Sequence, residues 1–326
     1  MTNIRFDRRR FVGGAAGLGL AATLPGGLRA QDAFPSDTIN VVTHAGAGGG
    51  TDITTRMMML RARRHLGVDM QVVNKRGGSG SAALMYVDQQ PRDGYTIMAV
   101  TQSHIFQIIQ GKVPLAIDDL VGIARATDDP MVIAVPGSSD IATMDDLLAA
   151  SNAADGGLKW GTTFAGGADH VAIHNFTKKA GIPYTIVPFQ GGGDIVTNLV
   201  GGNVEVALLN YAEGESQFGT GDIRPVAALS AERLASLADT PTARELGIDA
   251  IGSTIRGFAA LSGVPAERIA TLEEGMVASM NEPVYQSYLA SGGMPANSVL
   301  GSEAWTAEIR RIHDESRSAL EELGMI

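Results

Sequence analysis

The chain of 326 residues contains no cysteine. A chain without thiols has no thiolate nucleophile, no thiolate metal site and no disulfide bond. Positive charge is also scarce, because 25 lysines and arginines stand against 35 acidic residues and leave a formal net charge of −10. No basic tract lies beyond the N-terminus, which argues against nucleic acid as a partner. The apolar run at residues 12–24 is too short to span a bilayer.

The first 30 residues have the layout of an export signal. A basic cluster, Arg8-Arg9-Arg10, meets the apolar run, and Leu28-Arg29-Ala30 offers a cleavage site before Gln31. This order is that of a signal peptide, and the adjacent arginines resemble the twin-arginine export signal. We therefore expect export to the periplasm with cleavage near Ala30; an uncleaved anchor is the alternative.

Glycine, by contrast, is abundant, with 41 residues in the chain, and hydrophobic residues make up 44%. This content is enough for real hydrophobic cores, and the length suggests two domains or one large one. The excess glycine gathers in short segments between apolar runs, at residues 46–50, 77–80, 166–167, 191–193 and 201–202. These segments are therefore predicted to be loops.

The first glycine loop is the strongest local signal. It follows an apolar run at 39–42, which is typical of a strand, and precedes 53–66, which is typical of a helix. Glycine lets backbone N–H groups approach a ligand, and a helix start adds unpaired donors and partial positive charge. Such a turn favours an anion, either carboxylate or phosphate. The predicted ligand contacts are His44, Ala47, Gly48, Gly49, Gly50, Thr51 and Asp52.

Two other interpretations of this loop remain. The first is a dinucleotide-binding loop, but its fingerprint requires a third glycine where this chain has Thr51. The carboxylate of Asp52 is also a poor neighbour for a pyrophosphate. A tight turn without a ligand is the second, although the loop holds more glycine than a turn needs.

Short apolar runs alternate with amphipathic ones along the first part of the chain. This alternation predicts parallel strands with helices on both faces of a sheet. Ligands of such sheets bind beyond the carboxyl ends of the strands. Gln102 and Ser103, which follow the run 95–100, are therefore candidate contacts. Capping of the next helix is the alternative role for both.

We interpret an apolar run at 131–135 as a strand crossing into a second domain, where a second glycine loop follows a short strand predicted at 158–160. This loop, Gly161–Asp169, leads into a helix predicted over 168–179. Two such loops in two domains suggest one cleft that holds a ligand from both sides. The candidate contacts are Thr162, Thr163, Gly166, Gly167, Ala168 and Asp169.

His170 and His174 lie four residues apart on this helix, a spacing that can hold a metal ion. No glutamate stands between them as in H-E-x-x-H, and no third ligand is evident nearby. A packing or capping role is favoured, and we expect neither a metal nor a cofactor.

Three further candidates come from later segments. Phe189 and Gln190 precede a third glycine loop, and Asn210 ends an apolar run at 204–209. They are predicted to lie on the same edge as the second loop, although Phe189 also suits a plain core position.

A return crossing is predicted over Ser253–Leu261, preceded by a short helix ending at Leu246. Arg256 interrupts this otherwise apolar run beside Gly257. An arginine near a hinge can bind a carboxylate through two hydrogen bonds. A surface position is the alternative.

Six motifs in order now indicate a family. The chain resembles the periplasmic solute-binding proteins of tripartite tricarboxylate transporters, also called the Bug family. The matching segments are Gly48–Asp52, Asn74–Gly80, Pro91–Thr96, Gly161–His170, Val187–Gly191 and Pro241–Gly247.

The resemblance implies an α/β, two-lobed Venus flytrap fold in which each lobe is a sheet flanked by helices and two crossing strands act as the hinge. Residues 1–30 would be the signal peptide, 31–134 with 257–326 the first lobe, and 135–256 the second. It also implies capture of a small organic acid for the permease subunits of a membrane transporter. The first and second loops would close on the ligand carboxylate with backbone N–H groups. We expect a monomer without catalytic activity.

The chain also departs from the family pattern. It has Thr43-His44 where Pro-Phe is usual, Phe189 where tyrosine is usual, and Arg256 where an aromatic residue is expected. His44 adds a titratable donor by hypothesis. Because these changes alter the pocket wall, the resemblance does not identify the ligand. An exported enzyme using Asp52, Asp169 and His170, or a ligand sensor, remains an alternative.

Overall fold

The structure is a computed structural model that describes residues 34–163, 165–189 and 191–326. The predicted signal peptide and Gln190 lie outside these residues. Within the described ranges, none of the helices has the length and apolar character needed to cross a membrane.

The strands form one hydrogen-bonded series in the order β2-β1-β3-β9-β4-β7-β5-β6, and β8 pairs with β4. Strands β1 to β3 are parallel to one another where they pair, and so are β5, β6 and β7. The strand bounds are Ile39–Thr43 (β1), Met70–Asn74 (β2), Thr96–Thr101 (β3), Leu120–Pro136 (β4), Leu158–Thr162 (β5), Tyr184–Pro188 (β6), Val206–Asn210 (β7), Ile223–Ala228 (β8) and Ser253–Leu261 (β9).

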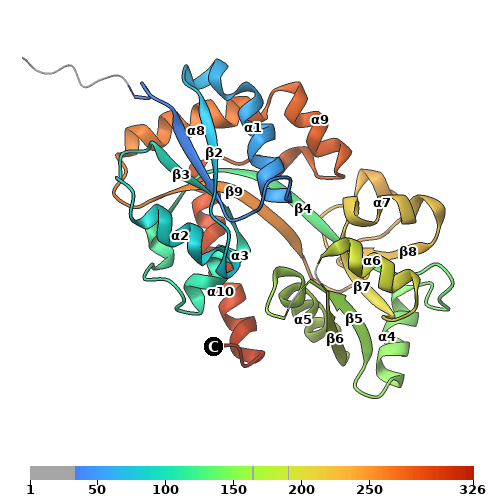
Figure 1. The fold of residues 1–326 in the computed structure, drawn as a ribbon. Coiled ribbons are helices and arrows are strands. Elements are labelled where there is room, and N and C mark those ends of the chain that lie inside the picture. Colours follow the sequence, from blue (N-terminus) through green and yellow to red (C-terminus); the bar gives the residue numbers. More distant parts are fainter. Residues whose placement is uncertain (1–33, 164, 190) are drawn as a thin grey trace, which may run out of the picture. The chain divides into compact units, whose positions relative to one another are not determined.

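Two antiparallel strands, β4 and β9, join the two groups of parallel strands (Figure 1). Strand β4 pairs with β9 as far as Pro130 opposite Ser253, and from Met131 onward it pairs with β7. The predicted return crossing Ser253–Leu261 is confirmed. The crossing predicted at 131–135 is only the second half of β4, which already begins at Leu120. The lobe boundaries at 134 and 257 remain a prediction. They lie close to the point where β4 changes its partner from β9 to β7.

Helices cover both faces of the sheet. Near β1 and β3, α1, α8 and α9 lie on one face and α2, α3 and α10 on the other (Figure 1). Around β5 and β7, α4 and α5 lie opposite α6. The bounds are Gly50–Leu66 (α1), Ser81–Asp88 (α2), Gln102–Ile109 (α3), Met144–Ala153 (α4), Ala168–Ala180 (α5), Gly192–Val200 (α6), Tyr211–Thr220 (α7), Ala266–Met280 (α8), Pro283–Ser291 (α9) and Ser302–Glu322 (α10).

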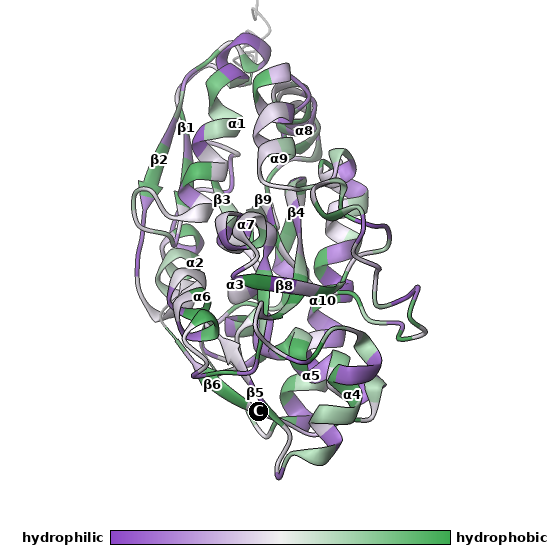
Figure 2. Ribbon diagram, turned by 90° about the vertical axis from the view of Figure 1, so that its right-hand side faces the viewer, coloured by the Kyte–Doolittle hydropathy of each residue, from purple (hydrophilic) through white to green (hydrophobic). Residues whose placement is uncertain are grey.

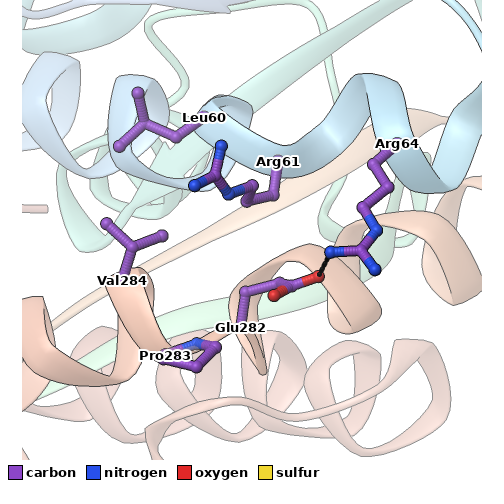
Figure 3. A pocket seen from close by; sticks show the side chains of 6 residues that line it. All are labelled: Leu60, Arg61, Arg64, Glu282, Pro283 and Val284. Carbon is purple, nitrogen blue, oxygen red and sulfur yellow. Dashed lines mark hydrogen bonds and ion pairs between the residues drawn. The ribbon is translucent and has the colours of Figure 1, made fainter.

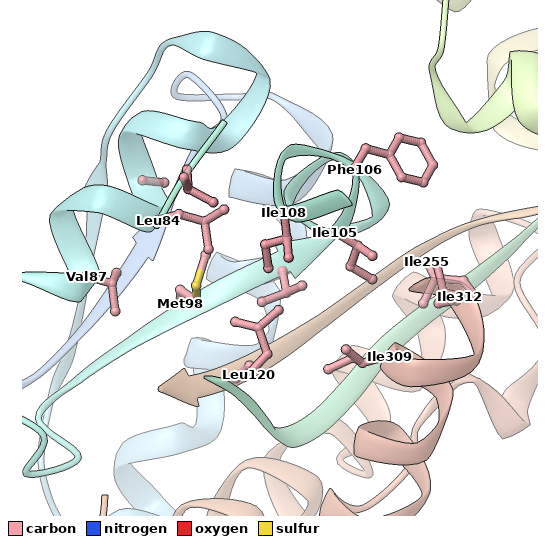
Figure 4. Packing of buried hydrophobic residues seen from close by; sticks show 14 of the residues in the cluster. Leu84, Val87, Met98, Ile105, Phe106, Ile108, Leu120, Ile255, Ile309 and Ile312 are labelled. Carbon is pink, nitrogen blue, oxygen red and sulfur yellow. The ribbon is translucent and has the colours of Figure 1, made fainter. Parts of the chain in front are cut away.

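The alternation of side chains along each strand produces these layers. Ile39 and Val41 of β1 point into the core under α1 and α8, whereas Val42 points into the opposite core under α2, α3 and α10. Figure 4 shows this second core, where Ile105 of α3 and Ile309 of α10 meet the strands. Helices that cover such faces carry both hydrophobic and hydrophilic residues along their length (Figure 2). The two-lobed α/β class predicted from the sequence is confirmed.

One local prediction is wrong. The segment ending at Leu246 forms hydrogen-bonded turns instead of the expected short helix. The hydroxyl of Thr242 accepts a hydrogen bond from the N–H of Glu245, and the carboxylate of Glu245 accepts one from the N–H of Thr242. These side-chain bonds begin a helical turn, but Gly247 with a positive φ of 85° ends it at once.

The indole of Trp305 in α10 anchors the crossing strands. It is buried, donates a hydrogen bond from Nε1 to the carbonyl of Phe258 at 3.1 Å, and lies against Gly257 of β9. A Cβ on Gly257 would stand 2.6 Å from the indole and 2.8 Å from the carbonyl oxygen of Ala124. Only glycine fits between this ring and the neighbouring strand.

We therefore expect Gly257→Ala to lower the free energy of unfolding by about 1–3 kcal/mol, because the methyl group overpacks a site closed by backbone on one side. Urea unfolding of the purified chain measures this. Gly219→Ala is the matched control, since Gly219 is an exposed position of α7 with open space around it. That substitution should be neutral or stabilising by up to about 1 kcal/mol. Equal stabilities for the two variants would contradict the packing argument.

Candidate functional site

The first glycine loop joins β1 to α1 and is closed by its own aspartate. The N–H of Gly49 donates to the carbonyl of Gly46 at 3.0 Å, and Gly48 has a φ of 80°, which favours glycine. The carboxylate of Asp52 folds back and accepts hydrogen bonds from the N–H of Gly48 at 2.9 Å and from Nδ2 of Asn74 at 3.0 Å. Asp52, predicted as a ligand contact, therefore holds the loop in shape.

Arg56 completes this arrangement. Its Nε lies 2.8 Å from Oδ2 of Asp52, and the Asp52 residue is only 1% exposed. The hydrogen bond from Arg56, helped by those from Asn74 and Gly48, lowers the pKa of Asp52 to about 2. The loop therefore carries an ionised and fully paired carboxylate at any physiological pH.

The second glycine loop, between β5 and α5, repeats this design. The N–H and the hydroxyl of Thr163 both donate to the carboxylate of Asp169, and the N–H of Gly166 donates to Nδ1 of His170 at 2.9 Å. Asp169 and His170 thus bind their own loop. The first N–H groups of α5 have no partner within the helix, as at any helix start.

Arg256 of β9 reaches the start of α1. A Cβ on Gly50, the first residue of α1, would lie 3.1 Å from Nη2 of Arg256. The helix N-terminus carries partial positive charge, so the guanidinium and the helix attract an anion to the same place. The side chain is 18% exposed, which rules out the alternative of a simple surface residue.

Asp129 of β4 stands behind Arg256. Its Oδ2 lies 3.5 Å from Nη1 of Arg256, and the residue is 8% exposed. Burial raises the pKa of Asp129 to about 7, although the positive charge of Arg256 opposes this rise. A carboxyl group that titrates near neutrality therefore lies beside the candidate anion site.

Asn210 and Glu213 surround Asp129 from the β7–α7 side. Nδ2 of Asn210 donates to the backbone carbonyl of Asp129 at 2.6 Å, and its Oδ1 accepts from the hydroxyl of Thr254 at 2.8 Å. Asn210, another predicted contact, thereby ties β7 to both crossing strands.

Glu213 is exposed as a residue, but its carboxyl group packs against Gly192 and accepts from the N–H of Asn210. Loss of hydration at this carboxyl raises its pKa, and the charge of Asp169 adds to the rise.

Two histidines line the other side of the first loop. The rings of His44 and His104 meet edge to face with centroids 4.5 Å apart. Burial, with a smaller contribution from the charge of Arg256, lowers the pKa of His44 to about 4. His44, which the sequence suggested as a titratable donor, is therefore a neutral imidazole at pH 7.

His104 is fully buried, and its Nδ1 accepts from the N–H of Thr101 at 3.0 Å. This acceptor role leaves the proton on Nε2, which has no partner among the described residues. The sequence prediction missed His104, although its place three residues after Thr101 is that of a capping box.

The other predicted contacts have mixed positions. Gln102 joins α3 to β9, because its Nε2 donates to the carbonyl of Ser253 at 2.6 Å and its Oε1 accepts from Ile255 at 3.0 Å. Phe189 is half-buried against the core under α6. Ser103 lies half-buried in α3. The remaining predicted residues lie in or beside the two glycine loops, with Thr51, Thr162, Gly166 and Gly167 buried, Thr163, Ala168 and Gly49 half-buried, and Ala47, Gly48 and Gly50 exposed.

Unpaired polar atoms gather where the two groups of strands meet. Nine side-chain atoms of the described residues are buried without a hydrogen-bond partner, and five of them belong to this region: His44 Nδ1, His104 Nε2, Thr127 Oγ1, Asp129 Oδ1 and Thr162 Oγ1. The other four belong to Arg92, Ser151, Trp160 and Arg224. Buried polar groups without partners are rare in folded proteins and carry a desolvation cost. The five atoms of this region therefore retain hydrogen-bonding capacity that the protein itself does not use.

A cavity of 680 Å³ lies between α3, β9 and α10 on one side and α5 on the other. Gln102 and Ala168 of the predicted contacts line it. Another pocket, of 470 Å³, lies between the second half of α1 and the start of α9, where Arg64 pairs with Glu282 (Figure 3). None of the predicted contacts lines this second pocket, and its charged walls pair with each other, so we assign it no ligand.

The two histidines of α5 have partners within the protein. Nδ1 of His174 lies 3.1 Å from the hydroxyl of Tyr184 and Nε2 lies 2.9 Å from Glu322, while His170 faces its own loop. In the part of the chain that the structure describes, no group of three or more His, Cys, Asp or Glu side chains is placed to hold a metal ion.

We expect Asp52→Asn to lower the free energy of unfolding at pH 7 by about 1–3 kcal/mol, because it removes hydrogen bonds to a charged, buried acceptor. The pKa of Asp52 is depressed in the folded state, so its contribution is present above the unfolded pKa, about 4, and is lost as the pH falls through about 2. The difference between wild type and variant should therefore shrink between pH 4 and pH 2.

Urea unfolding across this pH range measures the effect. The control is Asp69→Asn, whose carboxylate forms an exposed pair with Arg63 and should contribute less than about 0.5 kcal/mol. A loss that stayed constant down to pH 2 would show that the charge of Asp52 has no part in it.

Comparisons with known proteins agree with this geometry. The family model described as "Tripartite tricarboxylate transporter family receptor" matches residues 54–316. A protein of Cupriavidus necator, named "UPF0065 protein in gbd 5'region", is 26% identical over 98% of both chains. Protein BugT of Bordetella pertussis is 24% identical and covers 81% of this chain and 83% of its own.

Solved structures show the same fold. A TctC solute-binding protein from Polaromonas, without ligand, is 28% identical with a TM-score of 0.80 and covers 89% of this chain and 99% of its own. MatC from Rhodopseudomonas palustris, solved with malate, has 19% identity and a TM-score of 0.72 over 88% of this chain and 100% of its own. A second R. palustris protein, solved with adipate, has 22% identity and a TM-score of 0.73 over 89% and 98%.

The family model covers most of the chain, and the fold and its paired glycine loops agree with it. The chain therefore belongs to the tripartite tricarboxylate transporter receptor family.

Proposed function

We propose that this chain is a periplasmic receptor that captures a small organic acid between its two glycine loops and delivers it to the permease subunits of a tripartite tricarboxylate-type transporter. One observation carries the proposal. The guanidinium of Arg256 stands at the N-terminus of α1, so two features that attract a carboxylate coincide in one place.

The surrounding groups support an anionic ligand with polar contacts. The N–H groups at the start of α1 and α5 supply donors that cost no side-chain ordering on binding. The unpaired polar atoms of His44 and Thr162 offer further partners. Malate and adipate, which two proteins of the same fold were solved with, are both carboxylates.

Receptor function is favoured over catalysis. The groups of the alternative enzyme, Asp52, Asp169 and His170, each bind backbone N–H groups of their own loops. A general base needs a free acceptor within hydrogen-bond reach of its substrate. The family to which the chain belongs is a receptor family, which agrees with a binding role.

We expect a thermal-shift screen against malate, adipate, other di- and tricarboxylates and aromatic acids to raise the melting temperature with at least one acid. A ligand that binds only the folded state stabilises it by RT ln(1 + [L]/Kd). Arg256→Gln should weaken the affinity for that acid by roughly 10- to 100-fold, since it removes a charge-assisted contact. Isothermal titration calorimetry measures this loss.

Arg310→Gln is the control, because Arg310 forms an exposed pair with Asp118 away from the glycine loops. The Arg310→Gln variant should bind the acid with the same affinity as the wild type. No rise with any acid, together with a clear rise for NAD, would overturn the receptor proposal in favour of a nucleotide site.

Export is the second part of the proposal. Arg8-Arg9-Arg10 and the apolar run after them support a twin-arginine-like signal that is cleaved near Ala30. The mature protein in a periplasmic extract should begin at Gln31 and behave as a monomer in size-exclusion chromatography with light scattering. Replacing Arg9 and Arg10 by lysine should retain the precursor inside the cell. A periplasmic protein that keeps Met1 would show an anchor instead.

A further inference from the structure

Asp129 is buried at the point where β4 leaves β9 for β7. It pairs in register with Thr254, one residue before Pro130, after which β4 changes its partner. Only 8% of the residue is exposed, and its Oδ1 has no hydrogen-bond partner among the described residues. The proposed function gives this carboxyl group no role.

The contact between Asp129 and Arg256 is loose. Nη1 of Arg256 stands 3.5 Å from Oδ2, whereas charge-assisted pairs of this kind are usually about 2.7–2.9 Å long. Nη2 is directed to the other side, toward Gly50 at the start of α1. Asp129 therefore balances the charge of Arg256 without occupying all of its donors, and the guanidinium lies between Asp129 and the helix N-terminus.

Negative charge is in excess around this arginine. Glu213 from α7 and Asp128 from β4 act on Asp129 together with Arg256, and Asp169 from α5 acts on Glu213. Asp128 has its own partner, since its Oδ2 lies 3.3 Å from Nη1 of Arg125. Glu213 and Asp129 thus share the field of Arg256, and a ligand carboxylate adds a third negative charge to one guanidinium.

Like charges held close together in a buried site do not all stay ionised, because one of them takes up a proton. We propose that Asp129 is a positioning residue for Arg256, and that the ligand carboxylate takes over the guanidinium while Asp129 accepts one proton from solvent. This inference rests on the proposed function. In the empty site, Arg256 pairs with the ionised Asp129. In the filled site, Arg256 pairs with the ligand carboxylate and Asp129 is neutral.

The direction of the pH dependence follows. Asp129 already has a pKa of about 7 with Arg256 beside it, and losing that positive charge to the ligand raises it further. The filled site therefore holds more protons than the empty one near pH 7 to 8, so binding weakens as the pH rises there and levels off below about pH 6. The pKa of His44, about 4, and that of His104, lowered further by burial, keep both rings neutral in this window.

Titration calorimetry at pH 8 with malate and adipate as probes tests the proposal. Each titration is repeated in triethanolamine and in Tris, two cationic buffers whose ionisation enthalpies differ, so that the change in observed enthalpy gives the number of protons taken up. We expect an uptake between about 0.5 and 1 proton for the wild type, and an affinity that falls by up to about tenfold per pH unit above pH 7. At pH 5.5, measured in MES and in Bis-Tris, no uptake should remain once the proton release of the partly protonated acid is subtracted.

Asp129→Asn should remove both the uptake and the pH dependence of affinity. Asp128→Asn is the matched control on the same strand and should keep both. Glu213→Gln identifies which carboxyl takes the proton: retention of the uptake supports Asp129, and its loss assigns the proton to Glu213 and overturns the proposal.

The outcomes separate the two claims. Wild-type protein that binds an acid without proton uptake at pH 8 overturns the inference and leaves the receptor function standing, and this test needs no variant to fold. Uptake that persists in a folded Asp129→Asn variant overturns it as well. Absence of heat with every acid of the screen, at pH 5.5 and pH 8 alike, counts against the receptor function itself and removes the inference with it.

Discussion

The antiparallel pairing of β4 with β9 is the constraint on which the rest of the structure depends. Its register runs from Leu120 opposite Leu261 to Pro130 opposite Ser253, and it joins both groups of parallel strands. Asp129 and Arg256 both lie on this ladder, so the charged pair of the candidate site is positioned by backbone hydrogen bonds. Trp305 on Gly257 fixes the same ladder from the α10 side. A change in the ladder therefore moves the charged pair together with the lobes.

The two glycine loops are held in shape in the same way. An aspartate in the first turn of the helix accepts hydrogen bonds from its own loop and fixes the backbone without a bulky side chain. The solutions differ in charge, because Asp52 pairs with Arg56, whereas no ion-pair partner of Asp169 is found in the described part of the chain. With Arg256 also beside the first loop, the local charge favours a ligand carboxylate at α1 over one at α5.

Local patterns predicted the elements well and the site in part. The strand, loop and helix around residues 39–66 could be predicted because periodicity and glycine content are local properties. The first half of β4 was missed, since Asp128-Asp129-Pro130 has the composition of a turn. Its partner β9 lies more than a hundred residues away in the sequence, and that pairing overrides the local preference.

The same reason explains why the sequence did not reveal the hydrogen-bond partners of single residues. Arg256 interrupts an apolar run and is visible as an exception. Asp129 becomes notable only through Arg256, and the contact of His104 with His44 likewise joins distant segments. Gln102 was correctly placed at the carboxyl end of a strand, but its amide binds β9 at Ser253 and Ile255, and no local signal distinguishes that bond from a bond to a ligand.

An acidic protein that binds an acid has to do so at short range. The formal net charge of −10 repels an anionic ligand at a distance, and salt screens that repulsion only beyond about 8–10 Å. Inside the site, helix N-termini and one guanidinium provide attraction, but Asp129 and Glu213 reduce it as long as both are ionised. A carboxyl group that becomes neutral when the ligand arrives removes part of this repulsion. Burial of Asp129, which costs folding stability at high pH, is then the feature that lets the crossing strands accept a further negative charge.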